Sequence, residues 1–374
     1  MRDQAGSELF VGLISGTSMD GIDAAVVDFS GPQPKLPGAA NRAFAGDIRQ
    51  ALDQARHDPD AFPAAALSRL DARLGTAMAE AALAAIESAG LEPGNIRAIG
   101  SHGQTILHRP WDDPPHTLQI GDPHRIARLA GIDVVADFRR ADLAAGGQAA
   151  PLAPLFHQAV LHSDDEDRAV LNLGGIANIT LLPQTGPVRG FDTGPANCFL
   201  DAWYRRHHRD RFDAEGRWAA SGQVDAEWLG RLLDEPYFDR SAPKSTGIEH
   251  FSEAWLDRRL PDWAGARPAD IQATLAELTA RTVAAALERA AGGMPDAVLV
   301  CGGGVHNHDL LSRLKKHLAP ARVESTAACG IDPDQVEAML FAWLARERIH
   351  GRRVDTRAIT GASTPVLAGT IFQP

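Results

Sequence analysis

The chain has 374 residues, 44% of them hydrophobic and 23% charged, and its formal net charge is −11 at pH 7. This balance excludes a disordered or collagen-like chain, and the acidic excess argues against nucleic acid or an anionic membrane as a partner. At about 150 residues per domain, the length predicts two domains or one large domain.

The cysteines and the first residues indicate the cellular compartment. Cys198, Cys301 and Cys329 are odd in number and far apart, a pattern of reduced thiols rather than of a disulfide framework or a structural zinc site. The first residues contain only a short apolar stretch, unlike a signal peptide, and no apolar run reaches the roughly 18 residues of a membrane helix. We therefore expect a cytoplasmic protein that does not contact a membrane.

The first half of the chain opens with a strand, a glycine turn and a second strand. Apolar runs over residues 9–15 and 22–29 flank an Asp-Gly turn, which is a strong hairpin pattern. The Pro/Gly-rich stretch 32–46 predicts a loop, and apolar residues at helical spacing predict a helix over 63–89. Three short strands are then expected, over 96–100, 117–120 and 133–136.

The second half begins in the same way. A strand over 169–173, a Gly-Gly turn and a strand over 179–182 are followed by a short buried strand over 297–301. The final helix is expected to begin at Asp332, an N-cap residue followed by proline. Further helices are predicted over 197–209, 225–233, 270–291 and about 309–318.

Alternating strands and helices predict an α/β fold, and the repeated opening predicts two related domains that face one cleft. We expect an N-terminal domain over residues 1–145 and a C-terminal domain over 146–354. The tail, at about 355–374, is expected to pack back on the first domain.

The turn of the first half, GTSMDGID, combines glycines, hydroxyls and carboxylates. Glycine lets backbone N–H groups approach an anion closely, and the hydroxyls add donors. A plain hairpin turn explains the same residues equally well. The chain has no Walker A lysine loop and no GxGxxG motif.

Two further glycine-rich turns occur in the second half of the chain. Gly174 and Gly175 expose backbone between Asn172 and Asn178, whose side chains can bind a phosphate oxygen. Such a turn taken alone is usually structural, but one in each half favours a phosphate chain held between two domains. Three consecutive glycines end the strand over 297–301, and either an adenine or ribose packed on the backbone or a tight turn accounts for them.

Several carboxylates and polar residues follow predicted strands. Asp192, in GFDTGPAN, suits a general base beside phosphate-binding loops, or else only fixes a turn. The motif SHGQT and the arginines of ADFRRAD lie where ligands of α/β folds bind. Glu337 lies in the first turns of the last predicted helix, where glutamate usually complements the helix dipole. The His-x-His pair at 306 and 308 has no supporting ligands, so we do not expect a histidine metal site.

Six motifs in order resemble the anhydro-N-acetylmuramic acid kinase family: GTSMDGID, SHGQTILHRP, NLGGIANIT, GFDTGPANCFLDAW, PKSTGIEHF and CGGGVHN. The resemblance extends from Phe10 to about Arg346. It departs at Ala149 and Ala196, where the family commonly has glycine. It implies two ribonuclease-H-like (actin-like ATPase) domains around an ATP-binding cleft.

The resemblance also implies an activity and a set of site residues. The family uses ATP, with Mg²⁺, and water to convert 1,6-anhydro-N-acetylmuramic acid to N-acetylmuramic acid 6-phosphate in peptidoglycan recycling, and it suggests a homodimer. Asp192 is expected to be the catalytic carboxylate, and His102, Gln104, Arg140 and Glu337 are expected at the sugar. The predicted ATP-binding residues are Gly16, Thr17, Ser18, Met19, Asp20, Gly21, Ile22, Asp23, Gly174, Gly175, Asn178, Gly302, Gly303 and Gly304.

Two other functions stay open at this point. A kinase for another 1,6-anhydro sugar, such as levoglucosan, would use the same chemistry without a carboxylate on its substrate. An ATP-binding regulatory protein of the same superfamily would need no sugar chemistry, and the presence of Asp192 beside two phosphate turns argues against it. Sugar-dependent release of ADP distinguishes these alternatives.

Overall fold

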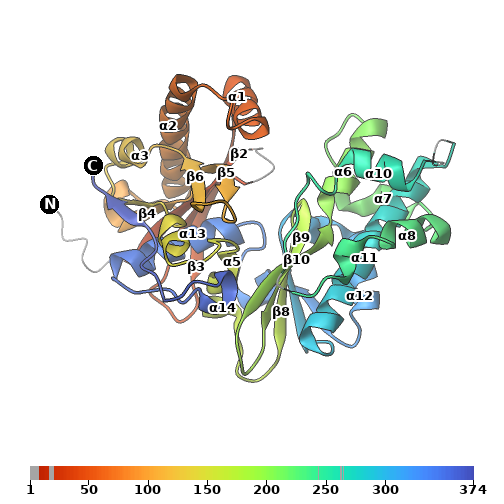
Figure 1. Ribbon diagram of the computed structural model, residues 1–374. Coiled ribbons are helices and arrows are strands. Elements are labelled where there is room, and N and C mark those ends of the chain that lie inside the picture. Colours follow the sequence, from red (N-terminus) through yellow and green to blue (C-terminus); the bar gives the residue numbers. More distant parts are fainter. Residues whose placement is uncertain (1–7, 17–20, 243, 262, 264) are drawn as a thin grey trace. The chain divides into compact units, whose positions relative to one another are not determined.

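The computed structural model describes residues 8–16, 21–242, 244–261, 263 and 265–374. The chain divides into two compact units: unit 1 consists of the residues up to Phe156 together with Gly330–Pro374, and unit 2 consists of His157–Cys329. Each unit is built on its own sheet (Figure 1).

Unit 1 contains a six-stranded sheet in the order β13-β7-β4-β1-β2-β3, and a separate pair, β5 and β6. Strands β1, β2 and β3 form an antiparallel meander, and β4 is parallel to β1. The elements are β1 (Leu9–Ile14), β2 (Gly21–Asp28), β3 (Lys35–Ala43), α1 (Gly46–His57), α2 (Ala64–Ser88), β4 (Ala98–Ser101), β5 (Gln104–Arg109), β6 (His116–Ile120), α3 (Pro123–Ala130), β7 (Val134–Ala136), α4 (Arg140–Ala144), α13 (Val336–Ile349), α14 (Arg357–Thr360) and β13 (Thr370–Phe372), with α5 (Ala153–Leu161) crossing the boundary.

Unit 2 contains a five-stranded sheet in the order β10-β9-β8-β11-β12. Its first three strands again form an antiparallel meander, and β11 is parallel to β8. The elements are β8 (Arg168–Leu173), β9 (Ile176–Leu182), β10 (Arg189–Pro195), α6 (Asn197–His207), α7 (Arg217–Ala220), α8 (Ala226–Leu233), α9 (Pro236–Asp239), α10 (Glu253–Arg259), α11 (Pro268–Ala291), β11 (Ala297–Cys301), α12 (His308–His317) and β12 (Arg322–Ser325).

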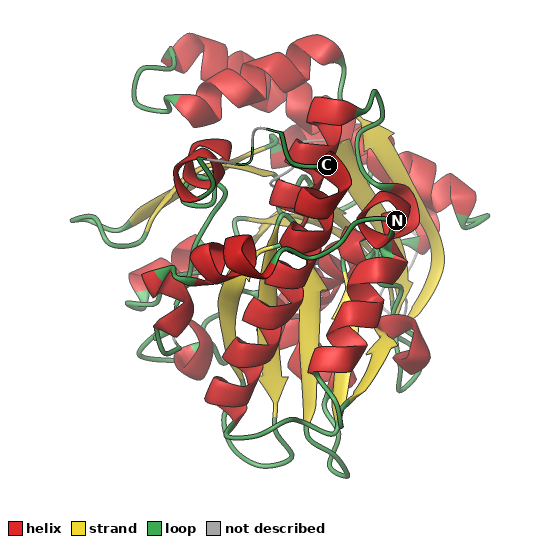
Figure 2. Ribbon diagram, turned by 90° about the vertical axis from the view of Figure 1, so that its right-hand side faces the viewer, coloured by secondary structure: helices red, strands yellow, loops and turns green. Residues whose placement is uncertain are grey.

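The two sheets therefore share a five-stranded topology: a three-stranded antiparallel meander whose first strand is followed, on its other side, by two parallel strands. Unit 1 adds β13, which pairs with β7 in the antiparallel direction. The shared topology is the ribonuclease-H-like arrangement, and it confirms the predicted α/β fold with two related domains. The strands lie beside helices in both units, as Figure 2 shows with strands in yellow and helices in red.

Helices pack on both faces of the sheet in unit 1. Val11 and Leu13 on β1 join the core formed with α2, whereas Gly12 faces the other way, toward α13. Gly12 and Gly100 are partners on adjacent strands. A Cβ on Gly12 would lie 1.7 Å from the carbonyl oxygen of Ala338, so only glycine lets α13 approach so closely.

Three predictions need correction. The stretch 32–46 is not all loop, because it contains β3, an edge strand in which Pro37 is tolerated. The last helix begins at Val336, since the Asp332 carboxylate accepts the N–H of Asp334 in a turn instead of capping the helix. Helix α13 belongs to unit 1, which differs from the expected domains 1–145 and 146–354, because it packs on β1 and β4.

Candidate active site

The predicted phosphate turn lies partly outside the described residues, which exclude Thr17, Ser18, Met19 and Asp20. No atom of the described residues lies within 4 Å of the position that a Cβ on Gly16 would occupy. Gly21 and Ile22 begin β2, where a Cβ on Gly21 would lie 2.5 Å from the carbonyl oxygen of Arg42. The Asp23 carboxylate accepts a hydrogen bond from Asn41 at 2.6 Å. The described residues thus leave space beside Gly16, whereas the sheet leaves no room for a side chain at Gly21.

The SHGQT motif contributes a buried polar network to unit 1. The Nε2 atom of His102 accepts a hydrogen bond from Nε of Arg139 at 3.0 Å, so the ring proton is on Nδ1, which faces the carbonyl of Gly103. Burial, with the Arg139 charge, holds the pKa of His102 well below its usual range. Gln104 accepts a hydrogen bond from the Ser15 hydroxyl at 2.6 Å. His102 is therefore a neutral, oriented imidazole.

Of the two adjacent arginines, Arg139 is the one in this network. Burial lowers the pKa of Arg139 to about 10, opposed by the nearby charges of Glu337 and Asp142. The Arg140 side chain is 60% exposed and lies 3.5 Å from the Asp137 carboxylate. The sequence predicted Arg140 at the sugar and gave no reason to distinguish it from Arg139. In the structure the two side chains differ in burial.

Glu337 stands in the first turn of α13 and remains reachable from solvent. Desolvation by surrounding protein and the charge of Asp23 raise its pKa, whereas Arg139 lowers it. The contact of α13 with Gly12 sets how near this carboxylate lies to the sheet. Unit 1 thus brings Glu337, Arg139 and His102 into one polar cluster.

In unit 2, three polar side chains form a row across the sheet. Asn172 on β8 is the register partner of Asn178 on β9, and Asn178 is the partner of Asp192 on β10. Register partners on adjacent strands project from the same face with Cβ atoms about 5 Å apart. The structure therefore brings together two motifs that are separated in sequence (Figure 1).

Asp192 is held by the segment that follows α9. The N–H of Thr246 donates to its Oδ2 at 3.0 Å, and its own N–H donates to the carbonyl of Lys244 at 3.1 Å. The hydroxyl of Tyr237 donates to the Asp192 carbonyl at 2.9 Å. Burial raises the pKa of Asp192 to about 6, although the Thr246 hydrogen bond and the Lys244 charge lower it. A fixed carboxylate that titrates near neutrality is suited to accept a proton.

Lys244, Thr246 and Tyr237 were not identified as site residues from the sequence. Lys244 and Thr246 belong to the motif PKSTGIEHF, which was quoted only for its family resemblance. This motif could have pointed to them, because it gathers polar residues in a stretch that has no helical or strand periodicity.

The Gly174–Gly175 turn has a structural use on one side. Its carbonyls accept the N–H groups of Ala196, Asn197 and Cys198 at the start of α6. A Cβ on Gly175 would make an ordinary van der Waals contact with Ile248, at 3.7 Å, so the described neighbours would tolerate it. The turn thus caps α6, and its packing does not by itself require Gly175.

The three glycines after β11 differ from one another. A Cβ on Gly302 would lie 2.3 Å from the Asn172 amide oxygen, and one on Gly304 would lie 2.5 Å from the Leu173 side chain. At Gly303 the nearest atom would be 3.9 Å away. The chain itself thus makes the close approach at Gly302 and Gly304, whereas at Gly303 the described neighbours would tolerate a Cβ.

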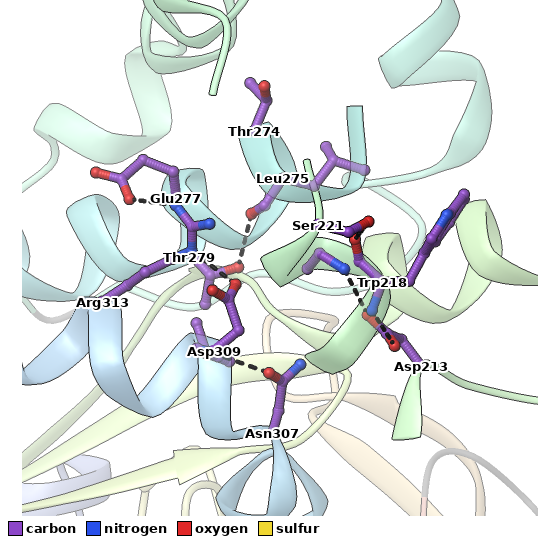
Figure 3. Close-up of polar contacts among 12 residues, drawn as sticks. Asp213, Trp218, Ser221, Thr274, Leu275, Glu277, Thr279, Asn307, Asp309 and Arg313 are labelled. Atoms are coloured by element: carbon purple, nitrogen blue, oxygen red, sulfur yellow. Dashed lines mark hydrogen bonds and ion pairs between the residues drawn. The ribbon is translucent and has the colours of Figure 1, made fainter. Parts of the chain in front are cut away.

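The helix after this glycine turn is firmly anchored (Figure 3). Asn307 accepts the N–H of Leu310 at 2.9 Å and so caps α12. Arg313 donates to Asp309 at 2.7 Å and to Glu277 on α11 at 2.9 Å. In the same region the Asp213 carboxylate accepts the N–H groups of Trp218 and Ala219 in the first turn of α7. These contacts fix the end of the turn.

The described residues form neither a recognisable metal cluster nor a membrane-spanning helix. Among them, no group of three or more His, Cys, Asp or Glu residues is arranged to hold a metal ion. No helix in that part of the chain is both long and apolar enough to cross a membrane.

Known proteins match this chain over most of its length. The family model described as anhydro-N-acetylmuramic acid kinase matches residues 8–374. The anhydro-N-acetylmuramic acid kinase of Xanthomonas axonopodis pv. citri (strain 306) is 52% identical over 371 residues, covering 98% of each chain. That of Xylella fastidiosa (strain Temecula1 / ATCC 700964) is 50% identical, covering 97% of this chain and 96% of the relative.

Among solved structures, a ROK family glucokinase from Streptomyces griseus in complex with glucose and AMPPNP is 16% identical. The match covers 91% of this chain and 99% of that chain, with a TM-score of 0.40. The family model and the curated relatives agree with the motifs. The chain belongs to the anhydro-N-acetylmuramic acid kinase family.

Proposed function

We propose that the protein opens 1,6-anhydro-N-acetylmuramic acid with water and phosphorylates O6 with ATP, giving N-acetylmuramic acid 6-phosphate and ADP. Membership of the family supports the reaction. The observation that carries it is Asp192, a carboxylate with a pKa of about 6 that the Thr246 N–H fixes at the end of a polar row. A regulatory protein without chemistry has no need for such a group.

The substrate dictates the order of events. Its O6 is bonded to C1 and has no proton, so it is a poor nucleophile. Asp192 takes a proton from a water molecule whose oxygen attacks C1. The C1–O6 bond breaks, and the electron pair left on O6 attacks the γ-phosphorus of ATP, which releases ADP. Ring opening and phosphorylation are thereby coupled.

The residues present fit a nucleotide and its metal. At Gly16, Gly175 and Gly303 a Cβ would not clash with the described residues, so the missing side chain leaves bare backbone, which accommodates phosphate or a flat base. Bound Mg²⁺ would offset charge on the transferring group and typically uses one or two protein carboxylates besides water and phosphate. Asp23, at the end of the phosphate turn, is the described carboxylate that would hold it.

For the sugar we propose His102, Gln104, Arg140 and Glu337, with Arg139 as their buried anchor. The lactyl carboxylate of the muramic acid favours a site with cations, and two adjacent arginines supply them. Levoglucosan has no such carboxylate and no use for them. This observation favours the muramic substrate over other anhydro sugars.

We also propose a cellular compartment and an oligomeric state for the enzyme. The family's place in peptidoglycan recycling supports a cytoplasmic enzyme that acts as a homodimer. None of the three cysteines is part of a disulfide in the structure, as suits a reducing compartment.

The deciding experiment is mass spectrometry of the product formed from the anhydro sugar, ATP and Mg²⁺ in H2¹⁸O. Early in the reaction the label should be at the anomeric oxygen and absent from the O6 ester. Label at O6, or a phosphorylated sugar with an intact anhydro ring, would contradict the mechanism. In parallel, Gly16→Val should fold normally and lose ATP affinity by calorimetry, and unchanged affinity would remove that turn from the site.

A further inference from the structure

Unit 2 contains a small pocket on the other side of the strand that carries Asp192. Phe191 forms part of its wall, and because neighbouring residues on a strand face opposite ways, it points away from the carboxylate. Phe191 and Ala286 are each 4% exposed and give the pocket an apolar base. The cavity measures about 100 Å³.

Four cationic side chains line this cavity: Arg189, Arg240, Lys244 and Arg289. They come from four separate segments, namely β10, the residue after α9, the loop beyond it and the end of α11. Such a gathering stands out in a chain with a net charge of −11. Like charges repel at close range unless something negative offsets them.

The carboxylates nearby do not balance this charge. Asp239 pairs with Arg289 at 3.1 Å, and its side chain is 85% exposed. Asp192 acts on Lys244 from the opposite side of the strand. Burial, together with the charges of Arg289 and Arg240, lowers the pKa of Lys244 to about 8. The cationic side chains that line the pocket therefore outnumber the nearby carboxylates, and Lys244 is the most buried of the four.

The donors of the pocket are only partly used by the protein. Within the described residues, Arg240 contacts the Tyr237 ring, 5.8 Å from its centre, and its guanidinium has no hydrogen-bond acceptor. Arg189 donates to one carbonyl, that of Ala290 at 2.8 Å. Lys244 donates to the carbonyls of Tyr237 and Phe238, both at 3.2 Å, which leaves one ammonium proton free. Ser241 adds a hydroxyl to the lining.

We propose that this pocket is a second anion site, which binds a phosphate-sized dianion through Arg189, Arg240 and Lys244. A cavity of about 100 Å³ has the volume of roughly three liquid water molecules, which suits one tetrahedral oxyanion. Guanidinium groups match phosphate oxygens in pairs, and an ammonium adds a point charge. Inorganic phosphate and the phosphoryl end of a hexose 6-phosphate share this chemistry. In the latter case the sugar would lie outside the cavity.

The test is calorimetric titration of the purified protein with inorganic phosphate, and separately with glucose 6-phosphate, at constant ionic strength. The double variant Arg189→Gln/Arg240→Gln should bind phosphate at least about tenfold more weakly than wild type. Arg258→Gln removes another exposed arginine, which does not line the pocket, and should stay within about twofold. Tighter binding of glucose 6-phosphate would identify a phosphorylated sugar as the occupant, and equal or weaker binding would identify free phosphate.

The same titration on Gly16→Val separates this site from the proposed ATP turn. The variant should keep its phosphate affinity if the cationic pocket is the site, even if the proposed kinase activity fails. Phosphate should also raise the melting temperature of wild type but not of the double variant. Unchanged phosphate affinity in a folded double variant, or no binding of either probe to wild type, would overturn the proposal.

Discussion

The two units share a topology but hold their acidic groups differently. In unit 1, Glu337 is carried by a helix whose backbone lies against two glycines of the sheet, and its electrostatic partner is Arg139. In unit 2, Asp192 is carried by the sheet itself and is held by backbone hydrogen bonds. The position of Glu337 thus depends on helix packing, whereas that of Asp192 depends on strand and loop hydrogen bonds.

This difference suggests different tasks. Hydrogen bonds to Oδ2 and to the backbone fix the direction of one carboxylate lone pair, as proton transfer requires. A carboxylate on a packed helix is set in place as a whole and is suited to bind a ligand. We therefore expect substitutions in unit 2 to act on turnover, and substitutions in unit 1 to act on stability and affinity.

The largest effect is expected for Asp192→Asn. The amide keeps nearly the same shape and can still accept the Thr246 N–H, but it cannot take a proton from water. Turnover should fall by about 10²–10⁴-fold, while ATP and sugar dissociation constants stay close to wild type. Measured kcat and calorimetry on one preparation check this. A kcat within about threefold of wild type, less than ~1 kcal/mol of barrier, would defeat the assignment.

Gly12→Ala tests the packing of unit 1. Its new methyl group would lie 1.7 Å from the carbonyl oxygen of Ala338, so α13 must shift. The free energy of unfolding should fall by about 1–3 kcal/mol, and sugar affinity should weaken with it. Denaturant melts and calorimetry measure the two effects. Gly94→Ala, at an exposed glycine with open space, is the control, and equal stability of both variants would refute the packing argument.

The pH profile tests the setting of Asp192. Its pKa is raised to about 6, and the base must be ionised, so activity should be lost as pH falls through that value. At pH 5 about one tenth of the enzyme has the carboxylate ionised, which predicts a roughly tenfold lower kcat/KM than at pH 8. If activity is instead lost only near pH 4, the pKa of Asp192 is not raised, and burial does not perturb this carboxylate.

Much of the fold was predictable because its patterns are local. The antiparallel pairing of β1 with β2 and of β8 with β9 follows from two apolar runs around a glycine turn, and both hairpins are confirmed. The unit to which α13 belongs was not predictable. It depends on the pairing of Gly12 with Gly100, which are far apart in sequence.

The candidate site shows the same limit. Asn178 and Asp192 were selected as separate motifs, and only strand register shows that they are neighbours. The loop that fixes Asp192 is 54 residues further along the chain, so nothing local linked Thr246 to it. The roles given to His102, Gln104, Arg140 and the phosphate turns remain predictions.

Gly302→Ala and Gly303→Ala separate structural from ligand-related glycines. Gly302 has a φ of +77° and the Asn172 oxygen in the way, so alanine should cost about 1–2 kcal/mol of stability. Gly303→Ala should leave stability nearly unchanged and weaken nucleotide binding if adenine or ribose packs there. Thermal melts and nucleotide titrations compare the pair. Equal stability loss in both would make the triple glycine purely structural.

The smallest expected effect is that of Tyr237→Phe, which removes the hydroxyl that donates to the Asp192 carbonyl at 2.9 Å. Tyr237 is 1% exposed, so the carbonyl loses a buried partner and stability should fall by about 1 kcal/mol. Because Tyr237 positions the strand and does not touch the carboxylate, kcat should drop only a few-fold, with KM unchanged.

The pH profile distinguishes this positioning role from a merely structural one. If Tyr237 helps to hold Asp192 in its buried setting, Tyr237→Phe should move the acid limb from near pH 6 toward the ordinary aspartate value, because a looser carboxylate gains water. Tyr204→Phe is the matched control, since Tyr204 is the chain's other tyrosine and lies on α6. If both variants show the wild-type limb, Tyr237 only stabilises the fold. A shift in the first alone shows that unit 2 tunes its carboxylate through the hydrogen bonds of its backbone.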